Sequence, residues 1–128
     1  MIRGIGVDSV YIPEIRRYLE DEKLSGPFVR RTFTPAEQAT AASRPNKAEY
    51  YAARFAAKEA AFKALGHLTA EKAFDLRIIE TLNRPDGSPY INITERLCSI
   101  LEAAGVNTLH ISITTETDYA TAFVVAEN

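Results

Sequence analysis

The 128-residue chain has a single cysteine, Cys98, and no tryptophan. One cysteine cannot form a disulfide within the chain, and it excludes a zinc site built from several cysteines. It also favours a reducing, cytoplasmic setting. No apolar run approaches the roughly 20 residues of a membrane-spanning helix, and the N-terminus lacks the longer apolar stretch of a signal peptide. We therefore expect a cytoplasmic protein that does not enter a membrane.

The chain also lacks a large excess of charge of either sign. It has 15 Lys and Arg against 17 Asp and Glu, and thus a formal net charge of −2. This balance argues against a protein that coats nucleic acid, although it leaves room for local basic clusters. Repeats, low-complexity stretches and linkers are missing. The length suits a single domain over residues 1–128 with one modest core.

The first half of the chain predicts one strand followed by three helices. Residues 2–7 predict the strand, and a short helix begins near Pro13. The apolar residues of this helix have the spacing of one helical face: Ile12, Ile15 and Leu19. Residues 34–37, Thr-Pro-Ala-Glu, predict a second helix that begins with a capping box. A long, alanine-rich helix follows over residues 47–65 and ends at Gly66.

The second half of the chain predicts mostly strands. In order, these elements are a strand at 74–82, a turn at 84–89, a strand at 90–93, a helix at 94–104, and strands at 109–114 and 119–126. Strands joined by short turns indicate antiparallel pairing. The predicted fold class is therefore α+β, with an antiparallel sheet packed on the long helix.

Residues 4–8, Gly-Ile-Gly-Val-Asp, combine two strand glycines with a carboxylate. Glycines inside a strand usually mark the close approach of another backbone or of a ligand. Their spacing differs from that of the dinucleotide-binding fingerprint. Asp8 falls where we expect the strand to end, a common place for a functional side chain. The simpler alternative is that Asp8 caps the turn that follows.

The long helix has a lysine within its predicted core stripe. Four apolar residues lie within about 80° of one another on a helical projection: Tyr51, Phe55, Phe62 and Leu65. Lys58 projects into the middle of this stripe. Its ammonium group must therefore either extend to solvent or meet an anion.

Further charged residues flank this stripe. Arg54 lies one turn before Lys58, whereas Glu59 and Lys63 lie on the other side, with the spacing of an ordinary surface ion pair. Two carboxylates near several cations also suit a site for magnesium and phosphate. Magnesium takes few carboxylates and shares substrate phosphates, which Arg and Lys contact. The spacing alone does not bring Asp8 and Glu59 together, so both interpretations stay open.

Four motifs, taken together, resemble those of the bacterial holo-acyl-carrier-protein synthases, the small trimeric type of 4′-phosphopantetheinyl transferase. The resemblance runs in order from residue 2 to about residue 126. The block Arg-Phe-Ala-Ala-Lys-Glu-Ala at 54–60 is the most specific part. The motifs are residues 4–8, residues 33–37, residues 54–60 with 63–66, and residues 112–114 with 119–120.

The resemblance implies a magnesium-dependent transfer of the phosphopantetheine arm of coenzyme A to a serine of an acidic apo-acyl carrier protein. It implies that Asp8 and Glu59 bind Mg²⁺, and that Glu59 and Lys63 belong to the catalytic machinery. Arg54, Lys58 and Lys63 would lie near the coenzyme phosphates. The turn formed by Gly87, Ser88 and Pro89 would lie near the adenine. A homotrimer with active sites between subunits is also implied.

Two positions depart from the family pattern. The family usually has a histidine where this chain has Thr115, so Glu116 becomes a candidate general base. Glu14 stands where a basic residue is common in the carrier-docking helix, although Arg16 and Arg17 keep its basic character. These departures leave open a homologue that binds coenzyme A or a carrier protein without transfer, or one with altered specificity. A structural trimer module is a third alternative.

Overall fold

The computed structural model describes residues 1–70 and 74–128. Its helices and strands are, in chain order, β1 (Ile2–Tyr11), α1 (Ile12–Glu20), α2 (Ser25–Thr32), α3 (Pro35–Ala42), α4 (Lys47–Leu65), η1 (Leu76–Ile78), β2 (Glu80–Asn83), β3 (Pro89–Asn92), α5 (Glu95–Ala104), β4 (Thr108–Thr115) and β5 (Tyr119–Glu127). The predicted α+β class is confirmed. No helix within the described residues is both long enough and apolar enough to cross a membrane.

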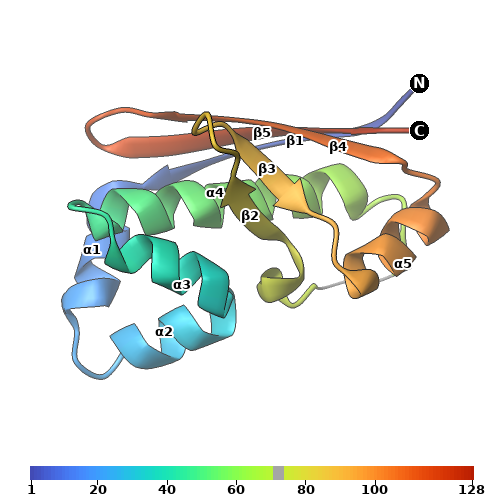
Figure 1. The fold of residues 1–128 in the computed structure, drawn as a ribbon. Helices are drawn as coiled ribbons and strands as arrows, with labels where there is room; N and C mark the ends of the chain where they lie inside the picture. Colours follow the sequence, from blue (N-terminus) through green and yellow to red (C-terminus); the bar gives the residue numbers. More distant parts are fainter. Residues whose placement is uncertain (71–73) are drawn as a thin grey trace.

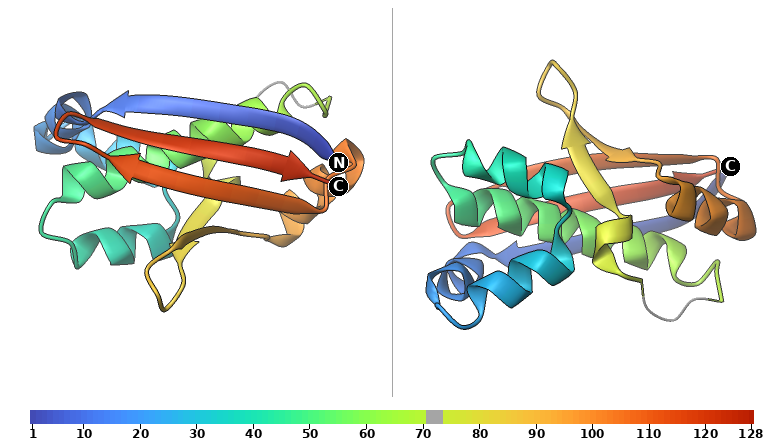
Figure 2. Two further views of the ribbon diagram at one scale, coloured as in Figure 1. Left: turned by 90° about the horizontal axis from the view of Figure 1, so that it is seen from above. Right: turned by 60° about the horizontal axis from the view of Figure 1, so that its bottom comes forward.

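The strands form two antiparallel sheets that lie on different sides of α4 (Figure 1). The larger sheet has the order β1-β5-β4, and α4 packs against one of its faces. The β2–β3 hairpin is a separate two-stranded sheet, in which β2 passes against α4 and β3 lies beside β4. The predicted packing of an antiparallel sheet on the long helix is confirmed, and the hairpin adds a second layer. No element covers the outer face of the larger sheet among the described residues (Figure 2, left).

Two glycines let β1 approach α4 very closely. A Cβ atom at Gly6 would lie 1.9 Å from the carbonyl oxygen of Ala60, and one at Gly4 would lie 2.0 Å from that of Ala64. Any larger residue would therefore push the strand away from the helix. The predicted close approach is confirmed, and its partner is a helix backbone. As a result, the side chains that follow Gly6 in β1 lie beside α4.

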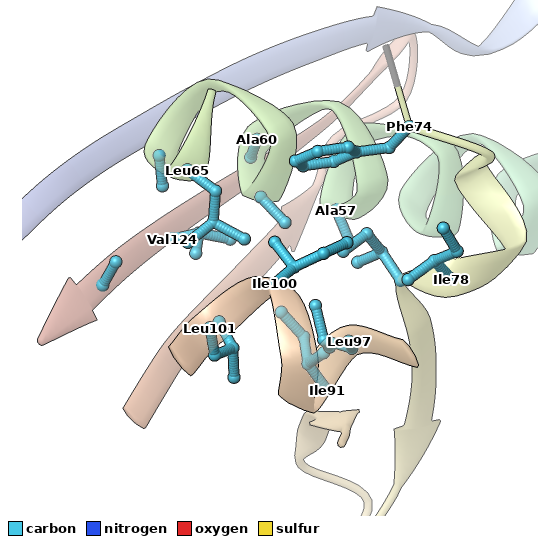
Figure 3. Packing of buried hydrophobic residues seen from close by; sticks show 14 of the residues in the cluster. Ala57, Ala60, Leu65, Phe74, Ile78, Ile91, Leu97, Ile100, Leu101 and Val124 are labelled. Atoms are coloured by element: carbon cyan, nitrogen blue, oxygen red, sulfur yellow. The ribbon is translucent and has the colours of Figure 1, made fainter. Parts of the chain in front are cut away.

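Alanines of α4 form the centre of the hydrophobic core (Figure 3). Ala57, Ala60 and Leu65 pack there against Val124 of β5 and against α5. The helix is buried around most of its circumference, because its alanine side faces the sheet while larger residues face the other elements. Of the predicted stripe, Tyr51 and Leu65 are buried, whereas Phe55 and Phe62 are half-buried.

Two predicted elements differ in the structure, and one helix was not predicted. The first strand continues to Tyr11, so Asp8 lies inside β1, opposite Ala122, rather than at the strand end. Within 74–82, only the last residues form a strand, because the Asp75 side chain accepts the backbone N–H of Arg77 and starts the short turn η1. Helix α2 was not predicted, because it contains a glycine and a proline. Pro27 lies in its first turn, where backbone N–H groups have no intrahelical partner.

Candidate active site

Asp8 lies beside the last turns of α4. Lys63 Nζ donates hydrogen bonds to Asp8 Oδ1 at 3.0 Å and to the Val7 carbonyl oxygen at 3.1 Å. The interpretation of Asp8 as a turn cap is therefore wrong, because the residue sits within a strand and its carboxylate meets a lysine. Lys63 forms its ion pair with Asp8 and not with Glu59, although the helical spacing suggested the latter.

Glu59 shares a cavity of about 630 Å³ with Asp8. Burial raises the pKa of the Glu59 carboxyl, the negative charge of Asp8 raises this pKa further, and Lys63 opposes the shift. The structure thus brings together the two carboxylates that the sequence left 51 positions apart. Their repulsion is the electrostatic situation that a bound cation relieves.

The same cavity has a large apolar wall. Side chains from β1, α1, α2, α4 and the start of β5 line it, and Tyr11 and Tyr119 form a ring pair with centroids 5.3 Å apart. Phe28 and Phe55 form another part of the wall. A site of this kind can hold a charged group at the carboxylates and a flexible organic chain beside them.

The donor set suits magnesium better than a transition metal. The described residues contain no cluster of three or more His, Cys, Asp and Glu side chains that could enclose a metal ion. Magnesium rarely needs such a cluster, because it is commonly held by one or two carboxylates plus waters and substrate phosphates. Asp8 and Glu59, in one cavity, fit that pattern.

Arg54 lies at a second, smaller cavity of about 270 Å³. Its guanidinium donates to Asn83 Oδ1 at 2.5 Å and lies 4.6 Å from the centre of the Tyr50 ring. Arg44 lies near the same ring, at 5.6 Å, and also lines this cavity. The Arg54 side chain is only 5% exposed, and its buried Nε has no hydrogen-bond partner. This cavity therefore offers guanidinium groups to an anion.

The β2–β3 turn is tied to Arg54 through a shared neighbour. Asn83, which accepts from Arg54, donates through Nδ2 to the Gly87 carbonyl oxygen at 2.9 Å. Gly87 has a φ of +91°, and the Ser88 backbone N–H and hydroxyl both donate to Asp86. Pro89 opens β3. The turn predicted to lie near an adenine is thus rigid, and it is linked to the second cavity.

Lys58 corrects one prediction. Its side chain is fully buried, and Nζ donates to Glu37 Oε1 at 2.8 Å and to the carbonyl oxygens of Leu76 and Ile79. Burial lowers the pKa of Lys58, and the Glu37 carboxylate opposes this shift. The predicted phosphate contact is wrong for this structure, because all three ammonium protons already have acceptors. Lys58 does meet an anion, but the anion belongs to the protein.

Glu116 lies in the turn between β4 and β5. Its backbone N–H donates to the Tyr119 carbonyl oxygen at 2.7 Å, and its side chain is exposed. Among the described residues, those that line the larger cavity include Tyr119 but not Glu116. Thr115 is the last residue of β4, opposite Ala120. Within one chain, this candidate base therefore lies near the cavity but outside its wall.

The predicted site residues thus divide into two groups. Asp8 and Glu59 line the larger cavity, and Lys63 is paired with Asp8. Arg54 lines the smaller cavity, and Asn83 links the turn at 87–89 to Arg54. Sequence reasoning missed three residues of the second group: Arg44, Tyr50 and Asn83. The only local signal was an arginine beside the loop proline Pro45, which did not indicate the position of either cavity.

Comparison with known proteins identifies the family to which the chain belongs. Residues 4–124 match the family model of the 4′-phosphopantetheinyl transferase superfamily. The chain belongs to this superfamily. The resemblance seen in the four motifs is confirmed, and the match includes every residue of the two groups.

Members of this superfamily include close relatives of the chain. It is 37% identical to a holo-[acyl-carrier-protein] synthase of Syntrophus aciditrophicus over 127 residues, which cover 99% of this chain and 97% of the relative. The crystal structure of the synthase from Neisseria meningitidis is similar with a TM-score of 0.88 and 35% identity, and each chain is covered completely. A synthase–CoA complex from Chronobacterium ammoniagenes has a TM-score of 0.79 and 27% identity, covering 97% of this chain and 96% of the other.

Proposed function

We propose that this phosphopantetheinyl transferase modifies an acyl carrier protein. It transfers the 4′-phosphopantetheine arm of coenzyme A to a serine hydroxyl of the apo-carrier. The serine oxygen forms a bond to the phosphorus that bears the arm. The P–O bond to the second phosphate breaks, and adenosine 3′,5′-bisphosphate leaves. The serine proton passes to a base. The observation that carries this proposal is the meeting of Asp8 and Glu59 in one cavity beside Lys63.

Asp8 and Glu59 would hold a magnesium ion, which when bound neutralises the pyrophosphate charge and stabilises the leaving phosphate. Lys63 binds a phosphate oxygen of the same pyrophosphate. For the proton acceptor we assign Glu116, and Glu59 is the alternative. The position of Glu116 next to Tyr119, a residue of the cavity wall, supports this assignment.

The second cavity supports a nucleotide-binding role for Arg54. The guanidinium groups of Arg54 and Arg44, which both line this cavity, suit a phosphate group of coenzyme A. The rigid turn formed by Gly87, Ser88 and Pro89 would then lie along the adenine. Lys58 is left out of this assignment, because its protons are used inside the protein.

A homotrimer would combine the two groups. The outer face of the larger sheet exposes apolar side chains, among them Ile5, Val7 and Phe123, and this face is uncovered in Figure 2. Contiguous exposed apolar surface supports association with further copies of the chain. A neighbouring subunit could then bring its smaller cavity, or its Glu116, toward Asp8 and Glu59. The single, exposed Cys98 supports a reducing cytoplasmic setting.

The test is a transfer assay with mass detection. The protein is mixed with coenzyme A, magnesium and several apo-carriers, and each carrier is examined for the mass of the added arm. Asp8→Asn and Glu59→Gln should lower the rate by about 100-fold or more. Glu102→Gln, which changes an exposed carboxylate on α5, is the matched control and should behave like the parent.

The alternative function is binding without transfer, and it is suggested by Thr115, which stands where the family usually has a histidine. A non-catalytic homologue would bind coenzyme A and magnesium normally but modify none of the carriers. That result would overturn the proposed transfer activity. Thr115→His would then be expected to restore transfer if the missing histidine were the cause.

A further inference from the structure

The ammonium group of Lys63 is bound to Asp8, one of the two proposed metal ligands. It is held by Asp8 Oδ1 at 3.0 Å and by the Val7 carbonyl oxygen at 3.1 Å. We infer that Lys63 is a tethered counter-ion of the Asp8–Glu59 pair, that a divalent cation displaces it, and that displacement delivers it to a coenzyme phosphate. This inference rests on the proposed function, because it takes Asp8 and Glu59 as the metal ligands.

Electrostatics favours a cation at this site even without a metal. The Asp8 side chain is 19% exposed and Glu59 is half-buried, so water screens their mutual repulsion incompletely. Lys63 supplies one positive charge from within the chain. A divalent cation held by Asp8 and Glu59 would neutralise both carboxylates and would repel the ammonium group of Lys63. A phosphate that approaches the metal then offers Lys63 a new anionic partner.

Lys63 is able to make this move, because it is weakly held. Its side chain is 53% exposed and has a flexible four-carbon stem. An exposed ion pair changes an equilibrium constant by no more than about fivefold. Lys58, five residues earlier on the same helix, differs in each respect: it is fully buried and donates to three acceptors. Lys58 is therefore fixed, whereas Lys63 is free to change partners.

If Lys63 is a displaced counter-ion, its substitution should change the affinities for metal and for coenzyme A in opposite directions. Removal of the Lys63 charge removes a competitor for Asp8, so metal affinity should rise. It also removes a phosphate contact, so coenzyme A affinity should fall. A residue that contacted phosphate alone would leave metal affinity unchanged. If Lys63 had a purely structural role, its substitution would lower the affinity for both the metal and coenzyme A.

The experiment measures each ligand separately by calorimetry on the whole chain. Magnesium or manganese is titrated without coenzyme A, and Lys63→Gln should bind the metal about fivefold more tightly than the parent. Coenzyme A is then titrated at saturating metal, and the same variant should bind it about tenfold more weakly. Lys63→Arg, which keeps the charge, should stay near the parent in the first titration.

Two further variants make the result specific. Lys47→Gln removes the same charge at the far end of α4 and should leave metal affinity unchanged. In an Asp8→Asn background, Lys63→Gln should no longer tighten metal binding, because the shared ligand is gone. Unchanged or weaker metal binding by Lys63→Gln would overturn the inference while leaving the proposed function intact. A parent protein that binds no metal would instead overturn the proposed metal site, and the inference with it.

Discussion

Glu37 and Lys58, 21 residues apart in sequence, form an ion pair of 2.8 Å in which both side chains are fully buried. The second carboxylate oxygen of Glu37 accepts the backbone N–H of Thr81 at 2.9 Å. Lys58 also donates to the carbonyl groups of Leu76, the first residue of η1, and of Ile79, which follows η1. The pair therefore ties α3, α4 and the start of β2 together. Asn83, which holds Arg54, follows Thr81 by two residues on β2.

Lys58→Met should strongly destabilise the protein. The substitution leaves Glu37 buried without its cation, and loss of one partner of a buried pair costs about 3–5 kcal/mol. The double variant Glu37→Gln/Lys58→Met removes both charges and should recover a large part of this loss. Urea unfolding of the parent and the variants measures the difference. A single variant that loses less than about 1 kcal/mol would contradict the assignment of the pair.

Gly6→Ala should separate β1 from α4. The added methyl would lie 1.9 Å from the Ala60 carbonyl oxygen, so the strand must move, at a cost of roughly 1–3 kcal/mol or more. Because Asp8 follows in the same strand, metal affinity should fall as well. Gly26→Ala in α2 is the matched control, because its methyl meets the movable end of Arg30. It should be neutral or stabilise the protein by about 0.5–1 kcal/mol. Equal effects of the two substitutions in thermal and urea unfolding would argue against the close packing.

Glu59→Gln should stabilise the metal-free protein at neutral pH. Burial and the charge of Asp8 raise the pKa of Glu59 in the folded state above its ordinary value of 4.5, which applies to the unfolded state. At a pH between the ordinary and the raised pKa, the folded state therefore binds more protons than the unfolded state. The contribution of Glu59 to stability is therefore present below pH 4.5 and is lost as the pH rises through the raised pKa. Thermal unfolding without metal should give the variant a higher Tm than the parent at pH 7, and the gap should close toward pH 4.

Added magnesium should reverse that order. The parent gains stability from the bound ion, whereas Glu59→Gln lacks a ligand and gains little. Glu102→Gln serves as the control, because it removes an exposed carboxylate on α5. A gap between parent and Glu59→Gln that widens toward pH 4 would show that the sign of the pKa shift is wrong.

Glu14→Arg should speed the encounter with an acidic carrier protein. Glu14 lies on α1 and lines the cavity that holds Asp8 and Glu59, so a carrier serine that enters the cavity passes close to it. Reversal of a charge at the rim of an interface acts mainly on the association rate and fades with salt. We expect about a threefold increase at low ionic strength. Glu20→Arg, on the same helix but outside this cavity, should give a smaller effect in stopped-flow measurements.

Much of the local structure could be predicted from the sequence. The capping box of Thr34 and Glu37 was predicted correctly, because each group reaches the other within one helical turn. The limits of α4 were also correct, since alanine propensity and the following glycine act locally. Asp8 and Glu59 were singled out because one short motif surrounds each of them, and the structure places both at one cavity, although β1 continues past Asp8.

Which charges meet depends on tertiary packing. Lys58 forms an ion pair with Glu37, whereas a phosphate contact was predicted for it. Lys63 forms an ion pair with Asp8, whereas the helical spacing suggested Glu59. Both choices depend on how closely β1 and α3 pack on α4. That packing is set by small residues such as Gly6 and Ala60, whose backbones touch across 54 positions of sequence. Helical periodicity describes one helix at a time, so it cannot assign a charged side chain to a partner that another element supplies.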